Sequence, residues 1–379
     1  MSKLYLPSAS QLDTMNEHLK NIANALAMDM DISTWAGIQK AVRVGVAPDL
    51  IPVGTQLAVN HSVYGTRLYD VVAHNYFKSA HDKNAHTMTL MCHENLDTLV
   101  QFDAPEAFFC AGVEFPAGTY NFTLPSNYSS WEAGTYQFTL SVGVPDGGQL
   151  VISGGSNIPL TNNTVSLYFD SYADEAMESN IPISKGNDGI NLGTLGVGLN
   201  NLHRVVFGSN NYKESAIRQF LNSSSPAGSV WKAQTKFDRF PSWMTSLEGF
   251  MKGFDEDFLS VIGEVIVPCA ASASYESPDS TTVKGGTYTV TDKFYLASHG
   301  EIFGTTTSGV TDDSVLFPYY ESATITDYIK YRGNVPAKWW TRTPYIGNAS
   351  NVYYVESTGG IANANARSGY GCSPVCTIV

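Results

Sequence analysis

The stretch WWTRTPYIGNASNVYYVESTGGIANANARSGYG, residues 339–371, combines two different compositions. It begins with a rigid block of two tryptophans, an arginine and a proline, and it continues as a run of Tyr, Asn, Ser, Gly and Ala. From Tyr345 to Gly371 it contains no Lys, Gln, Met or Trp, and its one Glu is Glu356. The run is too polar to be a core and too aromatic to be a linker.

This run has the composition of an antibody paratope. Tyrosine supplies a large amphipathic contact area at small entropic cost, while Ser, Gly and Asn supply adaptable hydrogen bonds. The composition therefore predicts a binding surface, with a polar Tyr-rich loop over the core as the alternative.

Composition and charge limit the partners of the chain. Its 379 residues are 43% hydrophobic and only 15% charged, with a formal net charge of -13. Plentiful Gly, Ser, Thr, Asn and Tyr favour a β-rich fold with many polar turns. Because phosphate binding depends on clustered Lys and Arg, we expect no binding to nucleic acid or to an anionic membrane.

Membrane insertion and export are not expected either. No apolar run approaches the ~20 residues that a membrane span requires. The N-terminal residues lack the apolar core of a signal peptide, since Pro, Ser and Gln interrupt them. We therefore expect synthesis in the cytoplasm without the usual route of export.

The chain divides into three predicted parts. Residues 1–46 form a helical segment for assembly, in which residues 8–27 are an amphipathic helix that either zips an oligomer or packs on its own domain. Residues 98–181 form an inserted β-rich domain, because short alternating strands recur about every ten residues. Residues 47–97 and 182–379 form the main domain. Its segment 210–224 is a predicted helix with Tyr212 and Phe220 on one face and Arg218 on the other.

Groups that could bind metals or act as nucleophiles form no recognisable motif. Histidines in one stretch fit no compact zinc spacing, so no metal or cofactor is expected. These histidines are His61, His74, His81, His86 and His93. Residues 255–257, an acidic triplet, are predicted to begin a solvated helix, and residues 193–198 are predicted to form a turn.

The scattered cysteines are expected to be reduced core thiols, with a bridge between Cys372 and Cys376 as the alternative. They are Cys92, Cys110, Cys269, Cys372 and Cys376. Without a nucleophile elbow, the sequence favours binding over catalysis.

Seven motifs, taken together, are specific. They are HTMTLMCHENL (86–96), NNYKESAIRQFLNS (210–223), VWKAQTKFDRFPSW (230–243), GFDEDFL (253–259), TDKFYLASHGEIFG (291–304), KWWTRTP (338–344) and NVYYVESTGGIANANARSGYGCSPV (351–375). A chain with these motifs resembles the variable proteins of diversity-generating retroelements, in the C-type-lectin-like group of phage and prophage genomes. The family's closing Gly-Val-Arg-Pro reads Gly371-Cys372-Ser373-Pro374 here, so a family arginine is replaced.

The resemblance implies how the surface arises. In that family a template repeat is copied with errors at adenines, and Asn codons in the template cannot yield Lys, Gln, Glu, Met, Trp or a stop. Residues 345–371 follow this rule, with Glu356 as framework. The implied ligand-binding positions are Tyr345, Gly347, Asn348, Ala349, Ser350, Asn351, Tyr353, Tyr354, Asn363, Asn365, Arg367, Ser368 and Tyr370. The implied scaffold anchors are Trp339, Trp340, Arg342 and Pro344, the last of which is expected to end a strand.

The scaffold beneath such a surface must be independent of it. We expect Val352, Val355 and Ile361 to be buried framework. Adjacent Tyr353 and Tyr354 are expected to point in opposite directions along a strand, with only one of them fully exposed.

The resulting hypothesis is an α+β protein with a C-type-lectin-like domain, an inserted sandwich-like β domain and an N-terminal helix. It is not an enzyme, and it recognises a host-cell surface protein or glycan from a virion, as a homo-oligomer (a trimer is one candidate) beside other virion proteins. A cytoplasmic or cell-surface location is the alternative. Two other functions stay open: a structural virion decoration protein without a ligand, and a formylglycine-generating copper oxidase that uses a cysteine pair.

Overall fold

The computed structural model describes residues 30–103, 210–232, 240–271, 286–304, 314–345 and 351–379, with short strands and helical pieces inside 10–17, 109–140 and 182–204. Short helices and small antiparallel sheets make up this part of the chain, so the predicted α+β class is confirmed. The assignment to the C-type-lectin-like fold stays a prediction. Within the described residues, no helix has both the length and the apolar character needed to cross a bilayer.

The largest sheet joins segments from both halves of the chain. Its strand order is β1-β2-β4-β21-β14, with antiparallel neighbours throughout. The strands are β1 (Gln56–His61), β2 (Gly65–His74), β4 (Met88–Cys92), β21 (Val375–Ile378) and β14 (Phe294–Tyr295). Every side chain of β4 is buried. Because side chains alternate between the faces of a strand, both faces of this sheet are covered at β4.

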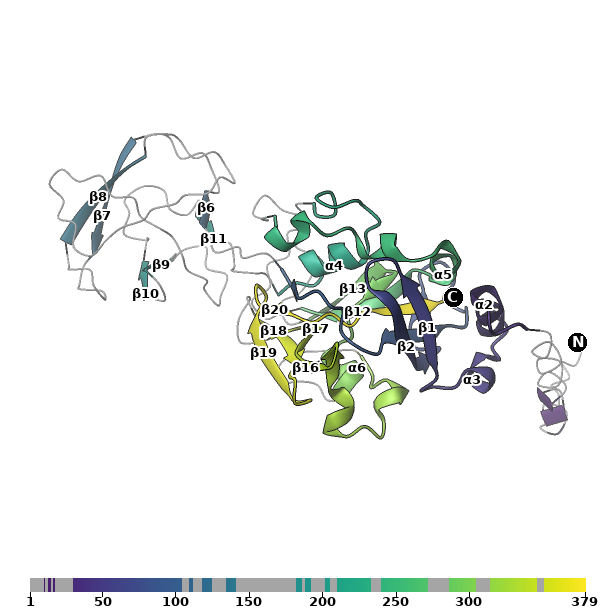
Figure 1. The fold of residues 1–379 in the computed structure, drawn as a ribbon. Helices are drawn as coiled ribbons and strands as arrows, with labels where there is room; N and C mark the ends of the chain where they lie inside the picture. Colours follow the sequence, from purple (N-terminus) through teal and green to yellow (C-terminus); the bar gives the residue numbers. More distant parts are fainter. Residues whose placement is uncertain are drawn as a thin grey trace, which may run out of the picture.

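Two three-stranded sheets and two strand pairs accompany the largest sheet in the main body. One sheet has the order β13-β12-β3, and the other has the order β17-β18-β19. Their strands are β3 (Lys78–Ser79), β12 (Val265–Ala270), β13 (Thr287–Asp292), β17 (Trp339–Pro344), β18 (Asn351–Val355) and β19 (Ile361–Asn365). The pairs are β5 (Val100–Gln101) with β20 (Gly369–Tyr370), and β15 (Lys330–Arg332) with β16 (Val335–Ala337). In Figure 1, β17, β18 and β19 lie at one end of the main body, while α2 and the C-terminus lie at the other.

The helices are short, and the side chains of Thr34, Ser215 and Ser298 cap the N-termini of α2, α4 and α6. They are α2 (Trp35–Arg43), α3 (Ala47–Leu50), α4 (Ala216–Leu221), α5 (Glu256–Val261) and α6 (His299–Phe303), with 3-10 turns η3 (Ser242–Thr245), η4 (Phe250–Gly253), η5 (Pro318–Tyr320) and η6 (Ile325–Tyr328). Ser298 and Glu301 form a capping box on α6, which ends at Gly304 in the left-handed conformation (φ 67°). The acidic triplet begins α5, with exposed side chains, as predicted.

An aromatic cluster packs beneath the largest sheet. Phe254 lies between the rings of Phe250, Phe258 and Phe294, at centroid distances of 4.9, 5.1 and 5.1 Å. The ring of His61 joins this cluster and packs directly on the backbone of η4. A Cβ atom at Gly253 would come within 1.9 Å of that ring, which explains why glycine occupies this position.

The predicted N-terminal helix and inserted domain fall mostly outside the described residues. Residues 10, 13, 14, 16 and 17 are helical, and the rest of segment 8–27 is not described. Described strand pairs in the middle of the chain are β6 (Phe109–Ala111) with β11 (Leu202–Arg204), β7 (Gly118–Leu124) with β8 (Gly134–Leu140), and β9 (Pro182–Lys185) with β10 (Asp188–Asn191). The main body extends past the predicted boundary at residue 97, because Phe102 is fully buried and contacts Trp340 at 5.9 Å.

Candidate ligand-binding surface

The sheet β17-β18-β19 carries the predicted binding positions on a buried base. Trp339 and Trp340 are completely buried, as predicted. Their indole N–H groups donate to the carbonyls of Tyr328 (3.1 Å) and Val100 (3.0 Å). The strand ends at Pro344, also as predicted. Two large rings with satisfied N–H groups thus hold β17 in the core.

Arg342 holds the same strand through an ion pair with Glu301 of α6. Its Nη1 donates to Oε2 of Glu301 at 2.6 Å, and Nη2 donates to Oε1. Further bonds reach the carbonyls of Leu296 (2.7 Å) and Pro268 (2.9 Å). Both side chains of the pair are at most 1% exposed. The predicted role of Arg342 as an anchor therefore has a physical basis in these bonds.

A buried amide closes the base of the loop between β17 and β18. Asn210 Nδ2 donates to the carbonyls of Tyr345 (3.2 Å) and Asn351 (3.0 Å), and Tyr345 N–H donates to the same Asn351 carbonyl at 2.9 Å. The loop positions Gly347, Asn348, Ala349 and Ser350 lie outside the described residues. Asn210 thus fixes both ends of the loop that carries them.

Tyr353 and Tyr354 point in opposite directions, but neither is exposed. Tyr353 (7% exposed) packs against Tyr345 and His299 at 5.5 and 5.6 Å. Tyr354 (5% exposed) packs against Tyr370 at 4.6 Å. The prediction that one of the two is fully exposed is wrong. The reason is that β18 is the middle strand of its sheet, with side chains packed over both faces.

The exposed positions are concentrated on β19 and the turn after it. Asn363 and Arg367 are exposed, while Asn351, Asn365 and Ser368 are half-buried. Ile361, expected in the buried framework, is 36% exposed because it begins the outer strand of the sheet. Val352 and Val355, by contrast, are completely buried, as predicted.

Hydrogen bonds shape this polar surface. Asn351 Nδ2 donates to Asn363 Oδ1 at 2.9 Å, from one strand to the next. In the turn, the N–H of Ser368 donates to the carbonyl of Asn365 (2.8 Å), and the N–H of Arg367 donates to Asn365 Oδ1 (3.1 Å). We call the set Asn351, Asn363, Asn365, Arg367 and Ser368 the polar surface.

A cation lies beside the polar surface, over two tyrosine rings. Lys338 Nζ is 5.0 Å from the ring centroid of Tyr354 and 5.2 Å from that of Tyr370. It also donates to the Tyr354 hydroxyl at 3.3 Å. This hydrogen bond raises the pKa of Lys338, so the ammonium stays charged in this setting.

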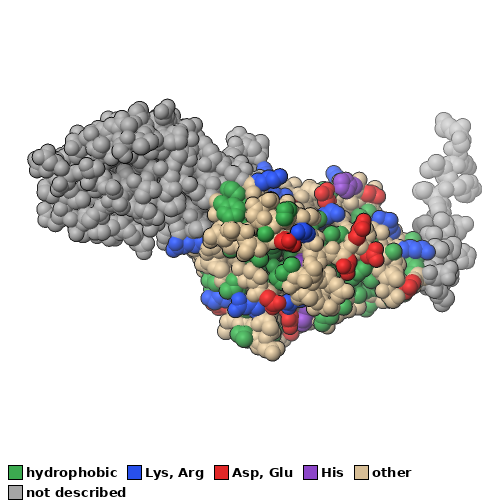
Figure 2. Space-filling model, turned by 45° about the horizontal axis from the view of Figure 1, so that its top comes forward, with side chains coloured by type: hydrophobic (Ala, Val, Ile, Leu, Met, Phe, Trp, Pro, Cys, Tyr) green, Lys and Arg blue, Asp and Glu red, His purple; other side chains and the backbone are tan. Residues whose placement is uncertain are grey.

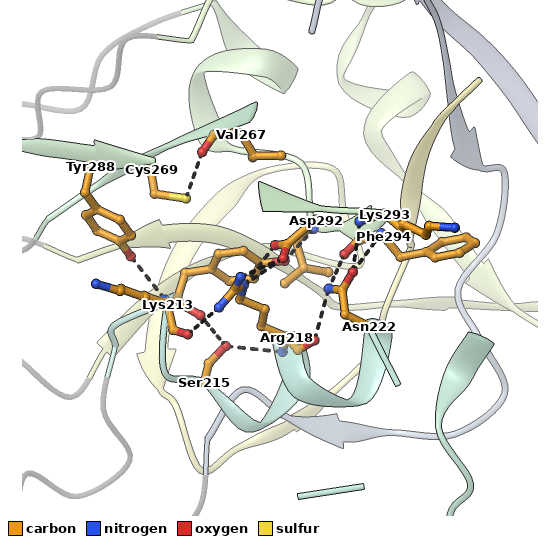
Figure 3. A network of polar contacts seen from close by, with 12 residues as sticks. Lys213, Ser215, Arg218, Asn222, Val267, Cys269, Tyr288, Asp292, Lys293 and Phe294 are labelled. Carbon is orange, nitrogen blue, oxygen red and sulfur yellow. Dashed lines mark hydrogen bonds and ion pairs between the residues drawn. The ribbon is translucent and has the colours of Figure 1, made fainter. Parts of the chain in front are cut away.

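A second charged pair joins α4 to β13 (Figure 3). Arg218 donates from Nη2 to Asp292 Oδ1 at 2.7 Å and from Nε to Oδ2 at 2.9 Å. From the helix face opposite Phe220, the Arg218 side chain thus reaches a buried carboxylate. Burial acts to lower the pKa of Arg218, but the hydrogen bonds to Asp292 outweigh it and raise that pKa. Tyr212 and Phe220 line the buried face of α4 as predicted.

Four cysteines are free and buried, which confirms the prediction of reduced core thiols for them. They are Cys92, Cys269, Cys372 and Cys376. Burial raises the pKa of Cys92 to about 11 and that of Cys269 to about 12. Burial also raises the pKa of Cys372 and Cys376. Thiols held protonated in this way are poor nucleophiles. The side chain of Cys110 lies outside the described residues.

Two of the histidines singled out above lie in a loop beside α2. His81 and His86 line a cavity of about 580 Å³ next to α2, together with Arg43 and Asp82. His81 Nε2 is 3.3 Å from the carboxylate of Glu264. Across the described ranges, no three His, Cys, Asp or Glu side chains converge as a metal site would require.

Charged side chains of both signs are mixed on the face that Figure 2 shows. On the described part of the face in Figure 2, Lys and Arg side chains lie among Asp and Glu side chains. The negative net charge therefore does not gather into one acidic patch on that part of the face.

Comparison with known proteins identifies the family. A family described as "Domain of unknown function (DUF6273)" matches residues 186–379, just over half of the chain, and the chain belongs to this family. No curated protein and no solved structure matches the chain. The match includes β17, β18, β19 and the helices that hold them, so the candidate surface and most of its base belong to the family domain.

Proposed function

We propose that this protein is a non-catalytic ligand-binding protein whose C-terminal surface is diversified, like the variable proteins of diversity-generating retroelements. The observation that carries the proposal is a separation of roles within one sheet. Asn363 and Arg367 are exposed, while Trp339, Trp340 and Arg342, which hold the sheet, are completely or almost completely buried.

This separation makes a changing surface physically possible. Substitutions at exposed positions away from special features change stability by about 0.5 kcal/mol or less. Truncation of a buried tryptophan or phenylalanine costs about 3–5 kcal/mol. A chain can therefore change its polar surface many times without unfolding, provided that the base is conserved in each copy.

The structure also restricts which predicted positions contact a ligand directly. The polar surface, with the half-buried Tyr345 and Tyr370, is accessible. Tyr353 and Tyr354 instead support it from below, because their rings are covered. Tyrosines in both roles fit a paratope-like surface, in which rigid aromatic groups hold adaptable polar ones.

The proposed setting is a virion that attaches to a host-cell surface through a C-type-lectin-like domain. Single contacts of this polar kind are weak, and a homo-oligomer displays them several times. Linking binding sites can increase overall avidity by about 10²–10⁴ without any new contact. A structural decoration protein without a ligand is the alternative that the following experiments must exclude.

The first experiment is genetic. We expect a reverse transcriptase gene and a near-identical repeat near the 3′ end of this gene, with differences only at template adenines and within the codons of residues 345–371. Differences spread evenly over all bases, or a locus without the repeat, would reject diversification.

The second experiment tests binding by the protein itself. The labelled chain is mixed with whole cells of the bacterium whose genome or phage carries the gene. A variant with all five polar-surface residues changed to serine or alanine is expected to stay folded and lose cell binding. A matched control, Lys40→Ser with Asp49→Ser on the exposed sides of α2 and α3, is expected to bind like the parent chain. Unchanged binding by the first variant would refute the proposal.

A further inference from the structure

We propose that the surface of this chain binds an acidic saccharide, whose anionic group docks at a corner formed by Lys338, Ser368 and Tyr370, with the buried ring of Tyr354 as its base. The inference rests on the proposed function and deepens it, because it names the ligand class. The corner is built from separate segments: the residue before β17, strand β18, the turn after β19, and β20.

The position of Lys338 is determined by its neighbours. Its backbone carbonyl accepts from Gly371 N–H at 2.8 Å. Its Nζ lies over two tyrosine rings whose centroids are 4.6 Å apart and whose planes are tilted by 50°. Cation–π attraction of this kind holds an ammonium group in place without neutralising its charge. The amine is therefore pre-positioned for an anionic ligand.

The chain itself does not neutralise this ammonium group. Some other cations of the main body have carboxylate partners: Arg67 pairs with Asp97, Arg218 with Asp292, and Lys252 with Glu248. Within the described residues, Lys338 has no carboxylate within ion-pair distance of 4 Å. The charge of Glu356 also raises the pKa of Lys338, but its effect is the smallest of those that act on this group. In a chain with a net charge of -13, an unneutralised cation at the binding surface indicates an anionic partner.

The hydroxyl groups of the corner add donors around the ammonium. Burial raises the pKa of the Tyr370 phenol, and the nearby Tyr354 hydroxyl raises it further, so Tyr370 keeps its proton. Ser368 lies close enough to affect the same phenol. An ammonium with N–H groups to spare, a phenol and a serine hydroxyl together match an anionic oxygen group, which accepts several hydrogen bonds.

The groups beside the corner favour a saccharide over an acidic peptide. Asn363 and Asn365 carry amides that both donate and accept, as sugar hydroxyls do. The half-buried ring of Tyr370 offers an apolar face with a polar tip to a sugar ring. We therefore expect a carboxylate or phosphate that is attached to a sugar or polyol.

The test measures binding of the full chain, immobilised, to four polymers in solution. The probes are polygalacturonate (carboxylate), a glycerol-phosphate polymer (phosphate), dextran (neutral) and polyglutamate (acidic peptide). We expect one or both of the first two to bind, more weakly as salt is increased, and to bind more tightly than dextran and polyglutamate. Which of the two binds identifies the anionic group.

Variants then locate the binding at the corner. Lys338→Met keeps the apolar arm over the tyrosines and removes the charge, and we expect an affinity loss of about ten- to a hundredfold, the size of one charge-assisted hydrogen bond. Lys338→Arg should retain most of the affinity. Lys40→Met, an exposed lysine of α2 at the other end of the body, should retain all of it.

Several results would overturn the inference. In the polymer experiment they are binding of dextran as tight as that of the acidic saccharides, tighter binding of polyglutamate, or no binding of polygalacturonate and the glycerol-phosphate polymer. In the variant experiment they are an unchanged affinity in Lys338→Met, or a loss in Lys40→Met equal to that in Lys338→Met. If these results occur while the polar-surface variant still loses cell binding, the ligand class is wrong and the proposed function stands. If the polar-surface variant keeps cell binding, the proposed function itself fails.

Discussion

Arg342 and Glu301 form an ion pair beneath β17 in which both side chains are at most 1% exposed. The carboxylate of Glu301 also accepts from the N–H of Ser298 at 2.8 Å, so one group both caps α6 and holds the strand. Since α6 and β17 come from different parts of the sequence, this pair fixes the position of the sheet β17-β18-β19 on the body.

Breaking this pair should destabilise the fold. Removing one partner of a buried ion pair leaves an uncompensated charge and costs about 3–5 kcal/mol. We expect Arg342→Met to reduce the free energy of unfolding by that amount in urea titrations. Lys252→Met, which removes an exposed pair with Glu248, should change it by about 0.5 kcal/mol or less. A double variant, Arg342→Met with Glu301→Gln, should recover part of the loss. A loss no larger than that of Lys252→Met would contradict the anchor role.

Asn210 should control the ends of the loop between β17 and β18. Asn210→Ala removes the donor from two carbonyls, and we expect a loss of about 1–3 kcal/mol in unfolding free energy. Hydrogen exchange at the Tyr345 N–H should become faster, because its bond to the Asn351 carbonyl loses support. Exchange at the distant N–H of Val71, bonded to Thr55, serves as the reference, and equal acceleration at both sites would argue against a local role.

His61 should make stability depend on pH. Its Nε2–H donates to the Phe250 carbonyl at 2.9 Å, and its Nδ1 accepts from the N–H groups of Val63 (3.1 Å) and Tyr64 (3.3 Å). Burial lowers the pKa of His61 below its usual value. As pH falls through about 6.5, the unfolded chain therefore takes up a proton first, and stability is lost.

We expect the thermal unfolding midpoint to be lower at pH 5.5 than at pH 7.5. His61→Gln should reduce this difference without removing it, because burial lowers the pKa of His74 as well. The same variant should be less stable at pH 7.5, where the neutral ring is fully bonded. An identical pH difference in His61→Gln and the parent chain would mean that another group is responsible.

Substitution of a buried supporting residue should cost much more unfolding free energy than substitution of an exposed residue beside it. Tyr354→Ala removes a buried ring, and we expect a loss of about 3–5 kcal/mol. Asn363→Ala, on the adjacent strand β19, should change the free energy of unfolding by about 0.5 kcal/mol or less. Chemical denaturation of both variants measures this. Comparable losses would mean that the polar surface helps to hold the fold, which the proposed function does not allow.

Periodicity and composition predicted the parts that depend on local sequence. The α+β class and the acidic start of α5 follow from apolar patterns and from capping chemistry, which act over a few residues. The same holds for the opposite directions of Tyr353 and Tyr354, since alternation is a property of any strand. The buried tryptophans of β17 and the strand end at Pro344 were implied by the family resemblance.

Long-range contacts decided the rest. No local pattern indicates that β18 is covered on both faces, that Arg218 reaches Asp292, or that Asn210 bridges Tyr345 and Asn351 across more than a hundred residues. The sequence by itself thus determined which residues are suited to a core and which to a binding surface. The tertiary structure alone decided which of them are accessible, because exposure depends on neighbours that the chain brings together only on folding.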